Sequence, residues 1–255
     1  MREVSENPRA RAIGAALDAM GWRPPDEFCV VLGGDGTMLK AVHLHGPFLR
    51  YIGVNCGHLG FLMNDLSPEP TAAARDLVEL FESGGLLVRQ FPRLSAITET
   101  ADGEVVEDRA VNDVYLERST GQSCHLRVVV DGVEVVDRLV CDGIITATPL
   151  GSTAYSFSAG GAAAHPLVRG MQLTPICPHS PRLGPLVLPH DAIVRVHVLH
   201  PDARPARVVV DGRERPEPAL AVEVRASGDT VALCFAPGHD FTATLIRKVV
   251  RAKGG

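Results

Sequence analysis

A short apolar run that leads directly into a glycine-rich loop constrains the fold of this chain most strongly. Residues 28–32 (Phe-Cys-Val-Val-Leu) are continuously apolar, which is typical of a strand buried on both faces of a parallel sheet. Thr37 is expected to cap a helix that Gly46 and Pro47 end. The loop between strand and helix comprises Gly33, Gly34, Asp35, Gly36 and Thr37.

The rest of the first third repeats this alternation. Residues 51–55 form a second short apolar run, and residues 9–21 and 68–82 have the apolar spacing of helices. Gly21 is expected to end the first of these helices. Alternating strands and helices predict a parallel sheet covered by helices.

After residue 85 the pattern changes to alternating and β-branched residues, with turn dipeptides at residues 102–103, 131–132 and 211–212 (each Asp-Gly). These dipeptides predict β-hairpins. The fold class expected is α/β, with an N-terminal Rossmann-like parallel α/β domain and a C-terminal mostly-β domain. The domains expected are residues 1–90 for phosphate binding and 91–236 for acceptor binding, with a tail, 237–255, that packs back on the first.

Composition excludes several classes of protein. A net charge of −5 and scattered arginines argue against a nucleic-acid partner. The six cysteines include no C-x-x-C pair, so they read as reduced thiols, mostly in the core. No stretch approaches the roughly 18 apolar residues of a membrane span, and no signal-peptide pattern begins the chain. We therefore expect a cytoplasmic protein with no membrane partner.

The glycine loop has the chemistry of a phosphate site. Backbone N–H groups at a helix N-terminus bind anions, and glycines let the backbone approach closely and tolerate a positive φ. Asp35 would repel phosphate unless it serves a proton or a metal, so it is either a base toward an attacking hydroxyl or a partner of Mg²⁺. The alternative is a tight turn whose aspartate only caps the helix.

Two further segments carry polar groups suited to a nucleotide. Asn112 and Asp113 open a strand; an amide can read an adenine edge and a carboxylate can accept from ribose hydroxyls, although such a pair is also a common turn signal. Residues 142–161 run from a strand into a loop rich in hydroxyls, in which Tyr155 offers a stacking face. The alternative for this loop is a plain connector.

Together these segments resemble the NAD kinase family, over residues 26 to about 215. The Gly-Gly-Asp-Gly-Thr motif alone is shared with lipid kinases of the diacylglycerol and sphingosine type, but the later segments make the match specific. The matching segments, in the family's order, are residues 32–37, 55–61, 112–113, 142–143, 151–155 and 158–161, followed by 165–166 and 174–180.

The resemblance implies transfer of the ATP γ-phosphate to the 2′-hydroxyl of the adenosine ribose of NAD, giving NADP. It implies Mg²⁺ or another divalent cation, and a homodimer or homotetramer. Asp35 would activate the hydroxyl, while Gly33, Gly34, Gly36 and Thr37 bind phosphate. The residues that would bind the acceptor are Phe61, Asn112, Asp113, Asp142, Thr153, Ala154, Tyr155 and Ser158.

The chain departs from the family pattern at several positions. Asp113 replaces the usual Glu, Leu150 replaces Ser or Thr, and Gly184 stands where Arg is common. The family's first strand, before residues 9–21, is expected to be missing. These changes leave open a kinase of another nucleotide or nucleoside, and a nucleotide-binding protein without activity. His43 and His45 lie two apart on a helix and are not expected to share a metal.

Overall fold

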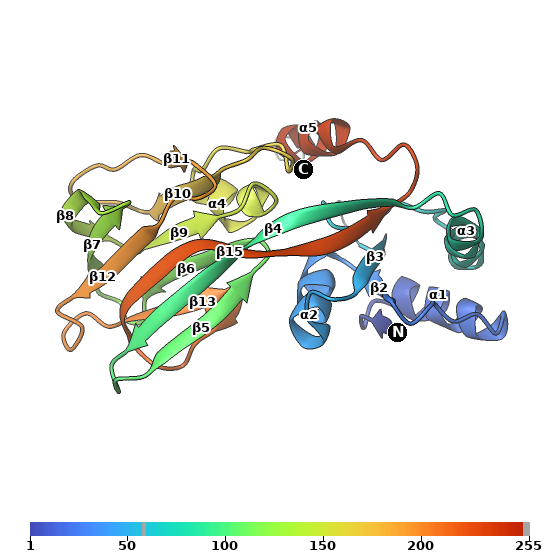
Figure 1. Cartoon of the computed structure of the whole chain (residues 1–255), viewed down its shortest axis with the longest axis horizontal. Helices are drawn as coiled ribbons and strands as arrows, with labels where there is room; N and C mark the ends of the chain where they lie inside the picture. The colour runs from blue at the N-terminus through green and yellow to red at the C-terminus, as the bar shows by residue number, and fades with distance from the viewer. Residues whose placement is uncertain (58–59, 252–255) are drawn as a thin grey trace. The chain divides into compact units, whose positions relative to one another are not determined.

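The computed structural model describes residues 1–57 and 60–251 (Figure 1). His58 and Leu59, which belong to the expected family segment at residues 55–61, lie outside the described residues. Contacts between Cα atoms divide the chain into two compact units. One unit holds Met1–Phe91 and the segment from Thr230 onward, and the other holds Pro92–Asp229.

The first unit contains a parallel sheet in the order β1-β2-β3-β15 (Figure 1). Its strands are β1 (Arg2–Val4), β2 (Phe28–Gly33), β3 (Arg50–Asn55) and the end of β15 (Ala219–Phe235). Every residue of β2 is buried, because helices cover both faces of the sheet. The helices are α1 (Pro8–Ala19), α2 (Asp35–His45) and α3 (Pro70–Glu82). The parallel α/β fold predicted for this part is confirmed.

Successive residues of β2 and β3 point to opposite faces of this sheet. Val30, Leu32 and Ile52 join the apolar residues of α1 and α3 in one core cluster. Gly53 faces α2, where a Cβ atom would come 2.8 Å from the Met38 side chain. The period of two in the strands therefore decides which helix each side chain meets.

The expectation that the first strand is missing is wrong. β1 pairs in parallel with β2, with Arg2 opposite Val30 and Val4 opposite Leu32. Ser5 extends the pairing by donating its backbone N–H to the Leu32 carbonyl over 2.9 Å. Three residues are too few to show a period in the sequence, whereas backbone pairing does not depend on side-chain type.

The helix after the glycine loop begins earlier than predicted. α2 starts at Asp35, with Gly34 as its N-cap and no side-chain capping bond, so Thr37 is not the cap. A carboxylate in the first turn is stabilised by the positive end of the helix, which favours the earlier start. The predicted end at Gly46, where φ is 78°, is confirmed.

The last helix, α5 (Phe241–Arg251), is anchored to the first unit by an aromatic cluster. The Phe241 ring lies 4.9 Å from Phe235, 6.0 Å from Phe91 and 4.6 Å from His239, measured between centroids. Edge-to-face contacts of this kind add to the gain from apolar burial. They fix the start of α5 on this unit.

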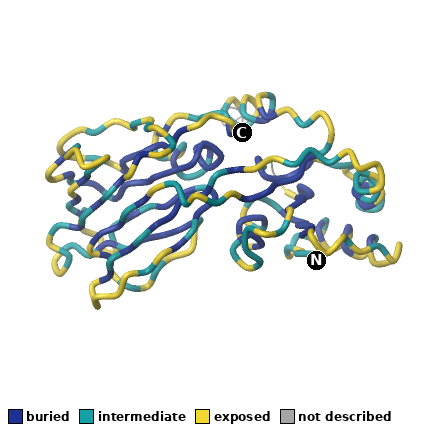
Figure 2. Tube along the Cα trace, viewed as in Figure 1, coloured by how far each residue is buried: buried dark blue, intermediate teal, exposed yellow. Residues whose placement is uncertain are grey.

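The second unit is a stack of two largely antiparallel sheets. One sheet joins β5-β4-β15-β12-β7-β8, and the other has the order β11-β10-β9-β6-β13-β14. One core cluster draws buried residues from both sheets, so they pack face to face (Figure 2). The strands are β4 (Leu87–Thr100), β5 (Val105–Ala110), β6 (Asp113–Arg118), β7 (Cys124–Val130), β8 (Val133–Cys141), β9 (Gly143–Ala147), β10 (Met171–Ile176), β11 (Leu186–Leu188), β12 (Val194–Leu199), β13 (Ala206–Val210) and β14 (Arg213–Glu214).

The predicted hairpins of the second unit are confirmed. Asp131 and Gly132 connect β7 to β8, and Asp211 and Gly212 connect β13 to β14, with positive φ at all four residues. Positive φ at both central residues gives a turn whose twist matches that of the flanking strands. The mostly-β character predicted for this part is also confirmed. None of the helices in the described ranges is long and apolar enough to cross a membrane.

Candidate functional site

In the first unit, the Asp35 carboxylate is held by backbone amides from another loop. Asp35 lies just beyond the end of β2, and the loop that follows β3 passes over it. Phe61 donates its N–H to Oδ2 over 3.0 Å, and Leu62 donates to Oδ1 over 3.1 Å. These bonds join the loops that follow two neighbouring parallel strands, the usual place for a ligand in such sheets.

At two positions of this site, glycine is required because a side chain would collide with its neighbours. A positive φ is not the reason. A Cβ on Gly33 would lie 2.5 Å from Thr37 Oγ1, and one on Gly60 would lie 2.4 Å from Asp35 Oδ1. Gly34 and Gly36 face open space, and Gly33, Gly34 and Gly36 are absent from the residues with positive φ. The loop therefore makes no use of the positive φ that glycine tolerates, while open backbone for an anion at the start of α2 is present.

In the second unit, the Asp211 carboxylate fixes the backbone that carries Asn112 and Asp113. It accepts N–H groups from Val111 over 2.7 Å, Asn112 over 2.8 Å and Asp113 over 3.1 Å. In return, the Asp211 N–H donates to the Asp113 carbonyl over 3.0 Å. Bonds to a charged acceptor are about twice as strong as neutral ones, so this turn is rigid.

The same arrangement places the buried Asp113 carboxyl close to the half-buried Asp211 carboxylate. Asp113 is 4 % exposed, and burial, followed by the charge of Asp211, raises the pKa of the Asp113 carboxyl to about 7. The neighbouring Asn112 Oδ1 is buried and finds no hydrogen-bond partner among the residues that the structure describes. An unpaired buried acceptor is costly, which suits an atom that awaits a ligand donor.

The loop after β9 packs directly on Asn112. Thr148 donates its hydroxyl to the Val111 carbonyl over 2.8 Å, and its N–H donates to the Asn112 carbonyl over 2.8 Å. A Cβ on Gly151 would lie 2.2 Å from the Asn112 carbonyl oxygen, so this close approach requires glycine. The structure thus brings together the segments at 112–113 and 148–155, both predicted from sequence.

Short helical turns carry the remaining predicted residues. They are η1 (Gly151–Thr153) and α4 (Tyr155–Ser158). Thr153 is buried and forms the end of η1, Ala154 is half-buried, and Ser158 is exposed. The Tyr155 ring packs edge-on against Tyr115, with 4.9 Å between centroids.

Asp142 and Tyr155 line one polar cavity of about 360 Å³. Arg118 also lines it and forms a 2.9 Å ion pair with Asp142. Phe61, by contrast, belongs to the first unit, where its ring is 2 % exposed. The predicted residues therefore form two groups, one in each unit.

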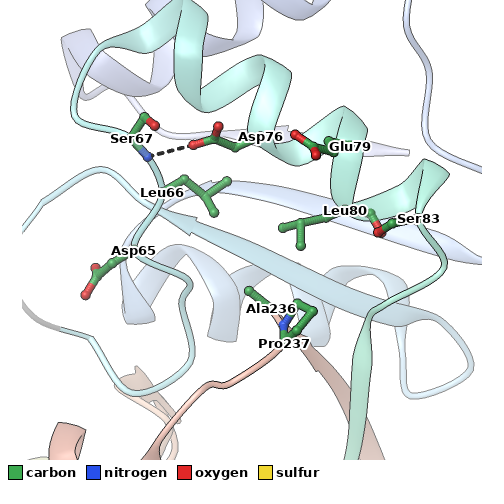
Figure 3. Close-up of a pocket in the computed structure, with 9 residues that line it drawn as sticks. All are labelled: Asp65, Leu66, Ser67, Asp76, Glu79, Leu80, Ser83, Ala236 and Pro237. Carbon is green, nitrogen blue, oxygen red and sulfur yellow. Dashed lines mark hydrogen bonds between the residues drawn. The ribbon is translucent and has the colours of Figure 1, made fainter.

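A cavity of about 380 Å³ in the first unit contains none of the predicted residues (Figure 3). Figure 3 shows Asp76 accepting a hydrogen bond from the Ser67 N–H, with Asp65 and Glu79 on the same lining. Three carboxylates disfavour a phosphate ligand. This cavity is therefore not a candidate for phosphate binding.

One of the two histidines of α2 pairs with a carboxylate of β1. His45 lies 2.8 Å from Glu3 Oε1 through its Nε2, on β1. Within the described ranges, no group of three or more His, Cys, Asp or Glu side chains could hold a metal ion.

Sequence reasoning missed three residues of these groups. The sequence indicated Asp211 only as part of a hairpin turn and Thr148 only as part of a polar loop, and it indicated no role for Lys248. In the structure Lys248 Nζ lies 3.6 Å from Asp35 Oδ2. Only the Asp-Gly dipeptide offered a signal, and it did not indicate which amides the aspartate would hold.

The parallel sheet, the glycine loop at its edge and the positioned carboxylate define a nucleotide-dependent phosphotransferase. Family models agree with this class. The N-terminal domain of ATP-NAD kinases matches residues 26–85, and the C-terminal domain of ATP-NAD kinases matches residues 111–233.

Individual relatives cover most of the chain. The NAD kinase of Zymomonas mobilis is 36 % identical over 97 % of this chain and 96 % of its own. The NAD kinase of Ralstonia nicotianae is 37 % identical over 89 % of this chain and 76 % of its own. The chain therefore belongs to the NAD kinase family, and the resemblance seen in its motifs is confirmed.

Solved structures agree on the fold. An Archaeoglobus fulgidus NAD kinase in complex with ATP superposes with a TM-score of 0.76 and 27 % identity, covering 98 % of this chain and 99 % of that chain. Yeast NADH kinase complexed with NADH gives a TM-score of 0.77 and 27 % identity, covering 90 % of this chain and 67 % of that chain.

The contact between Gly151 and Asn112 predicts a large effect of one methyl group. We expect Gly151→Ala to lower the free energy of unfolding by about 1–3 kcal/mol, because the added Cβ meets backbone that cannot move aside cheaply. Urea denaturation measures this change. Gly121→Ala is the matched control, since nothing lies within 4 Å of a Cβ there. Equal stability of the two variants would contradict the close contact.

The raised pKa of Asp113 predicts a pH-dependent stability difference. Between its ordinary value of 3.8 and about 7, folded Asp113 binds more protons than unfolded Asp113. Its contribution to stability is therefore full below about pH 4 and is lost as the pH rises through about 7. Asp113→Asn removes this loss, so the variant should gain stability relative to the unmodified protein by about 1.4 kcal/mol per pH unit, as an upper limit.

Denaturation from about pH 4 to pH 7, the range in which the difference develops, tests this expectation. Asp202→Asn, at an exposed position in the same unit, is the control, and its offset should stay constant. A constant offset for Asp113→Asn as well would show that Asp113 ionises normally.

Proposed function

We propose that this protein transfers the γ-phosphate of ATP to the 2′-hydroxyl of the adenosine ribose of NAD, giving NADP. The observation that carries the proposal is the Asp35 carboxylate, held by the Phe61 and Leu62 amides at the start of α2. The carboxylate is a quarter exposed, so a ligand hydroxyl can reach it. Membership of the NAD kinase family supports NAD as the acceptor.

In the proposed reaction, the ribose hydroxyl gives its proton to Asp35 while its oxygen forms a bond to the γ-phosphorus. The bond from the γ-phosphorus to the β,γ-bridging oxygen breaks, and its electron pair leaves with ADP. Holding acceptor and donor in line contributes more to such a transfer than the base does. Gly33, Gly34, Gly36 and Thr37 would provide the phosphate-binding backbone at the start of α2.

A divalent cation, Mg²⁺ in the first instance, fits the residues present. Mg²⁺ bound to nucleotides takes one or two carboxylates and completes its shell with phosphate oxygens and water. Asp35 could hold such a cation only as the alternative to its role as base. When bound, Mg²⁺ would neutralise phosphate charge.

The second unit would bind the acceptor. The unpaired Asn112 Oδ1 suits the adenine amino group as donor, and the Asp113 carboxyl suits ribose hydroxyls. In this proposal residues 1–90 carry phosphate transfer and residues 91–236 carry acceptor binding, with residues 237–255 returning to the first. The other acceptor residues would be Asp142, Thr153, Ala154, Tyr155 and Ser158 of the second unit and Phe61 of the first.

The turnover assay decides whether the departures from the family pattern change the acceptor. Leu150 is 4 % exposed, and nothing lies within 4 Å of a Cβ on Gly184. Asp113 stays beside Asn112 in the rigid turn held by Asp211. If the assay gives no NADP, two alternatives remain. The protein would be a kinase of a different nucleotide or nucleoside, or a nucleotide-binding protein without activity.

Turnover tests the acceptor and Asp35 together. Purified protein with ATP and Mg²⁺ should convert NAD to NADP, with the new phosphate placed on the 2′-oxygen by ³¹P NMR. Asp35→Asn should lower kcat by about a hundredfold or more, since it removes the proton acceptor. Asp26→Asn, at an exposed aspartate in the same unit, is the control and should keep full turnover.

Failure can take two distinguishable forms. Product from a nucleoside or another nucleotide, without NADP, would overturn the acceptor. Full turnover by Asp35→Asn would overturn the role of Asp35 and leave the acceptor assignment standing.

Assembly and location complete the proposal. We expect a homodimer or homotetramer, which light scattering after size-exclusion chromatography would show as a mass two or four times that of the chain. A single-chain mass at micromolar concentration would contradict it. We also expect a cytoplasmic location.

A further inference from the structure

We propose that Lys248 of α5 is a positioning residue for phosphoryl transfer, whose ammonium group offsets the Asp35 charge so that a triphosphate can approach. This inference rests on the proposed function, in which Asp35 faces the transferred phosphate. It assigns to the last helix a part in ATP binding.

The contacts of Lys248 converge on the carboxylate and on its neighbour. Its Nζ lies 3.6 Å from Asp35 Oδ2, the oxygen that also accepts the Phe61 N–H. The same ammonium lies 4.9 Å from the centroid of the Phe61 ring. A cation over an aromatic face is attracted to it, so the ring helps to hold the ammonium at the carboxylate.

The position of Lys248 is set by how α5 is anchored. Phe241 and Thr244 are buried, at 6 % and 3 % exposure, and Lys248 follows Thr244 on the same side of the helix. Ile246 and Val250 point away and are exposed. The aromatic cluster around Phe241 therefore determines which side chain α5 presents to Asp35.

The helix also borders open space beside the same loop. A cavity of about 300 Å³ is lined by Thr244 and Arg247 of α5 and by Gly60 and Asn64 of the loop over Asp35. Gly60 is the residue whose Cβ would collide with Asp35. A ligand at this loop would therefore meet α5.

Charge explains why Asp35 needs this partner. An ionised carboxylate repels phosphate. At a partly exposed site this repulsion is weaker than in a dry interior, but solvent and salt do not screen it completely. Lys248 and Asp35 are 27 % and 25 % exposed, so both meet solvent and a ligand. The chain has only three lysines, and another of them, Lys40, is exposed on α2.

Lys248→Met tests the proposal while keeping the length and helix preference of the side chain. We expect the KM for ATP to rise about tenfold, equivalent to about 1.4 kcal/mol, and the KM for NAD to stay within about threefold. Lys248→Arg should restore most of the loss, because it keeps the charge. Lys40→Met is the matched control and should change neither constant.

A double-mutant cycle shows whether Lys248 acts through Asp35. The probe is the Mg²⁺ complex of adenylyl imidodiphosphate, and its Kd is measured by calorimetry in proteins with Asp35 and with Asp35→Asn. Lys248→Met should weaken binding about tenfold with Asp35 present, and threefold or less in the Asp35→Asn background. Equal weakening in both backgrounds, or none in either, would overturn the proposal.

This readout is independent of turnover. If Asp35→Asn keeps full activity, the proposed role of Asp35 as base fails, yet the coupling in nucleotide binding can still be measured.

Circular dichroism and the melting temperature check that each variant folds. Lys248→Gln replaces Lys248→Met if Lys248→Met does not fold.

Discussion

The arrangement of the site in the first unit depends on two hydrogen bonds that backbone amides donate to the Asp35 carboxylate. Phe61 and Leu62 donate to its two oxygens, and bonds to a charged group contribute about 1.5–3 kcal/mol each. They tie the loop after β3 to the start of α2. Asn64 then ties that loop to the sheet, donating to the Gly53 and Cys234 carbonyls and accepting from the Ala236 N–H. The Asp35 carboxylate is therefore part of the framework of this unit.

The second unit uses the same device with a different residue. Asp211 accepts hydrogen bonds from three backbone amides and so fixes Asn112 and Asp113. This brings its carboxylate close to the buried Asp113 carboxyl. The site thus combines a rigid backbone with an Asp113 carboxyl whose pKa lies near neutrality. In both units a carboxylate fixes backbone amides, and its charge acts on a neighbouring group: Lys248 Nζ lies 3.6 Å from Asp35 Oδ2, and the charge of Asp211 helps to raise the pKa of Asp113.

Local signals in the sequence predicted local structure well. The Asp-Gly dipeptides at 131–132 and 211–212 form the expected hairpins, because positive φ is a property of those two residues. Two apolar runs became buried strands for an equally local reason. The prediction failed where a backbone partner decided the outcome. β1 exists through pairing with β2, and α2 starts at Asp35 instead of being capped by Thr37.

The sequence by itself determined the kind of chemistry: an anion-binding glycine loop, a carboxylate within it, polar segments suited to a nucleotide, and motifs specific enough to indicate the NAD kinase family. Only the tertiary structure decided which groups surround that carboxylate. Phe61 and Leu62 reach Asp35 from the next loop, Lys248 reaches it from the last helix, and Asp211 reaches Asn112 across a sheet. Periodicity and motifs report what neighbours along the chain can form, whereas these contacts join segments far apart in sequence, and only packing brings them together.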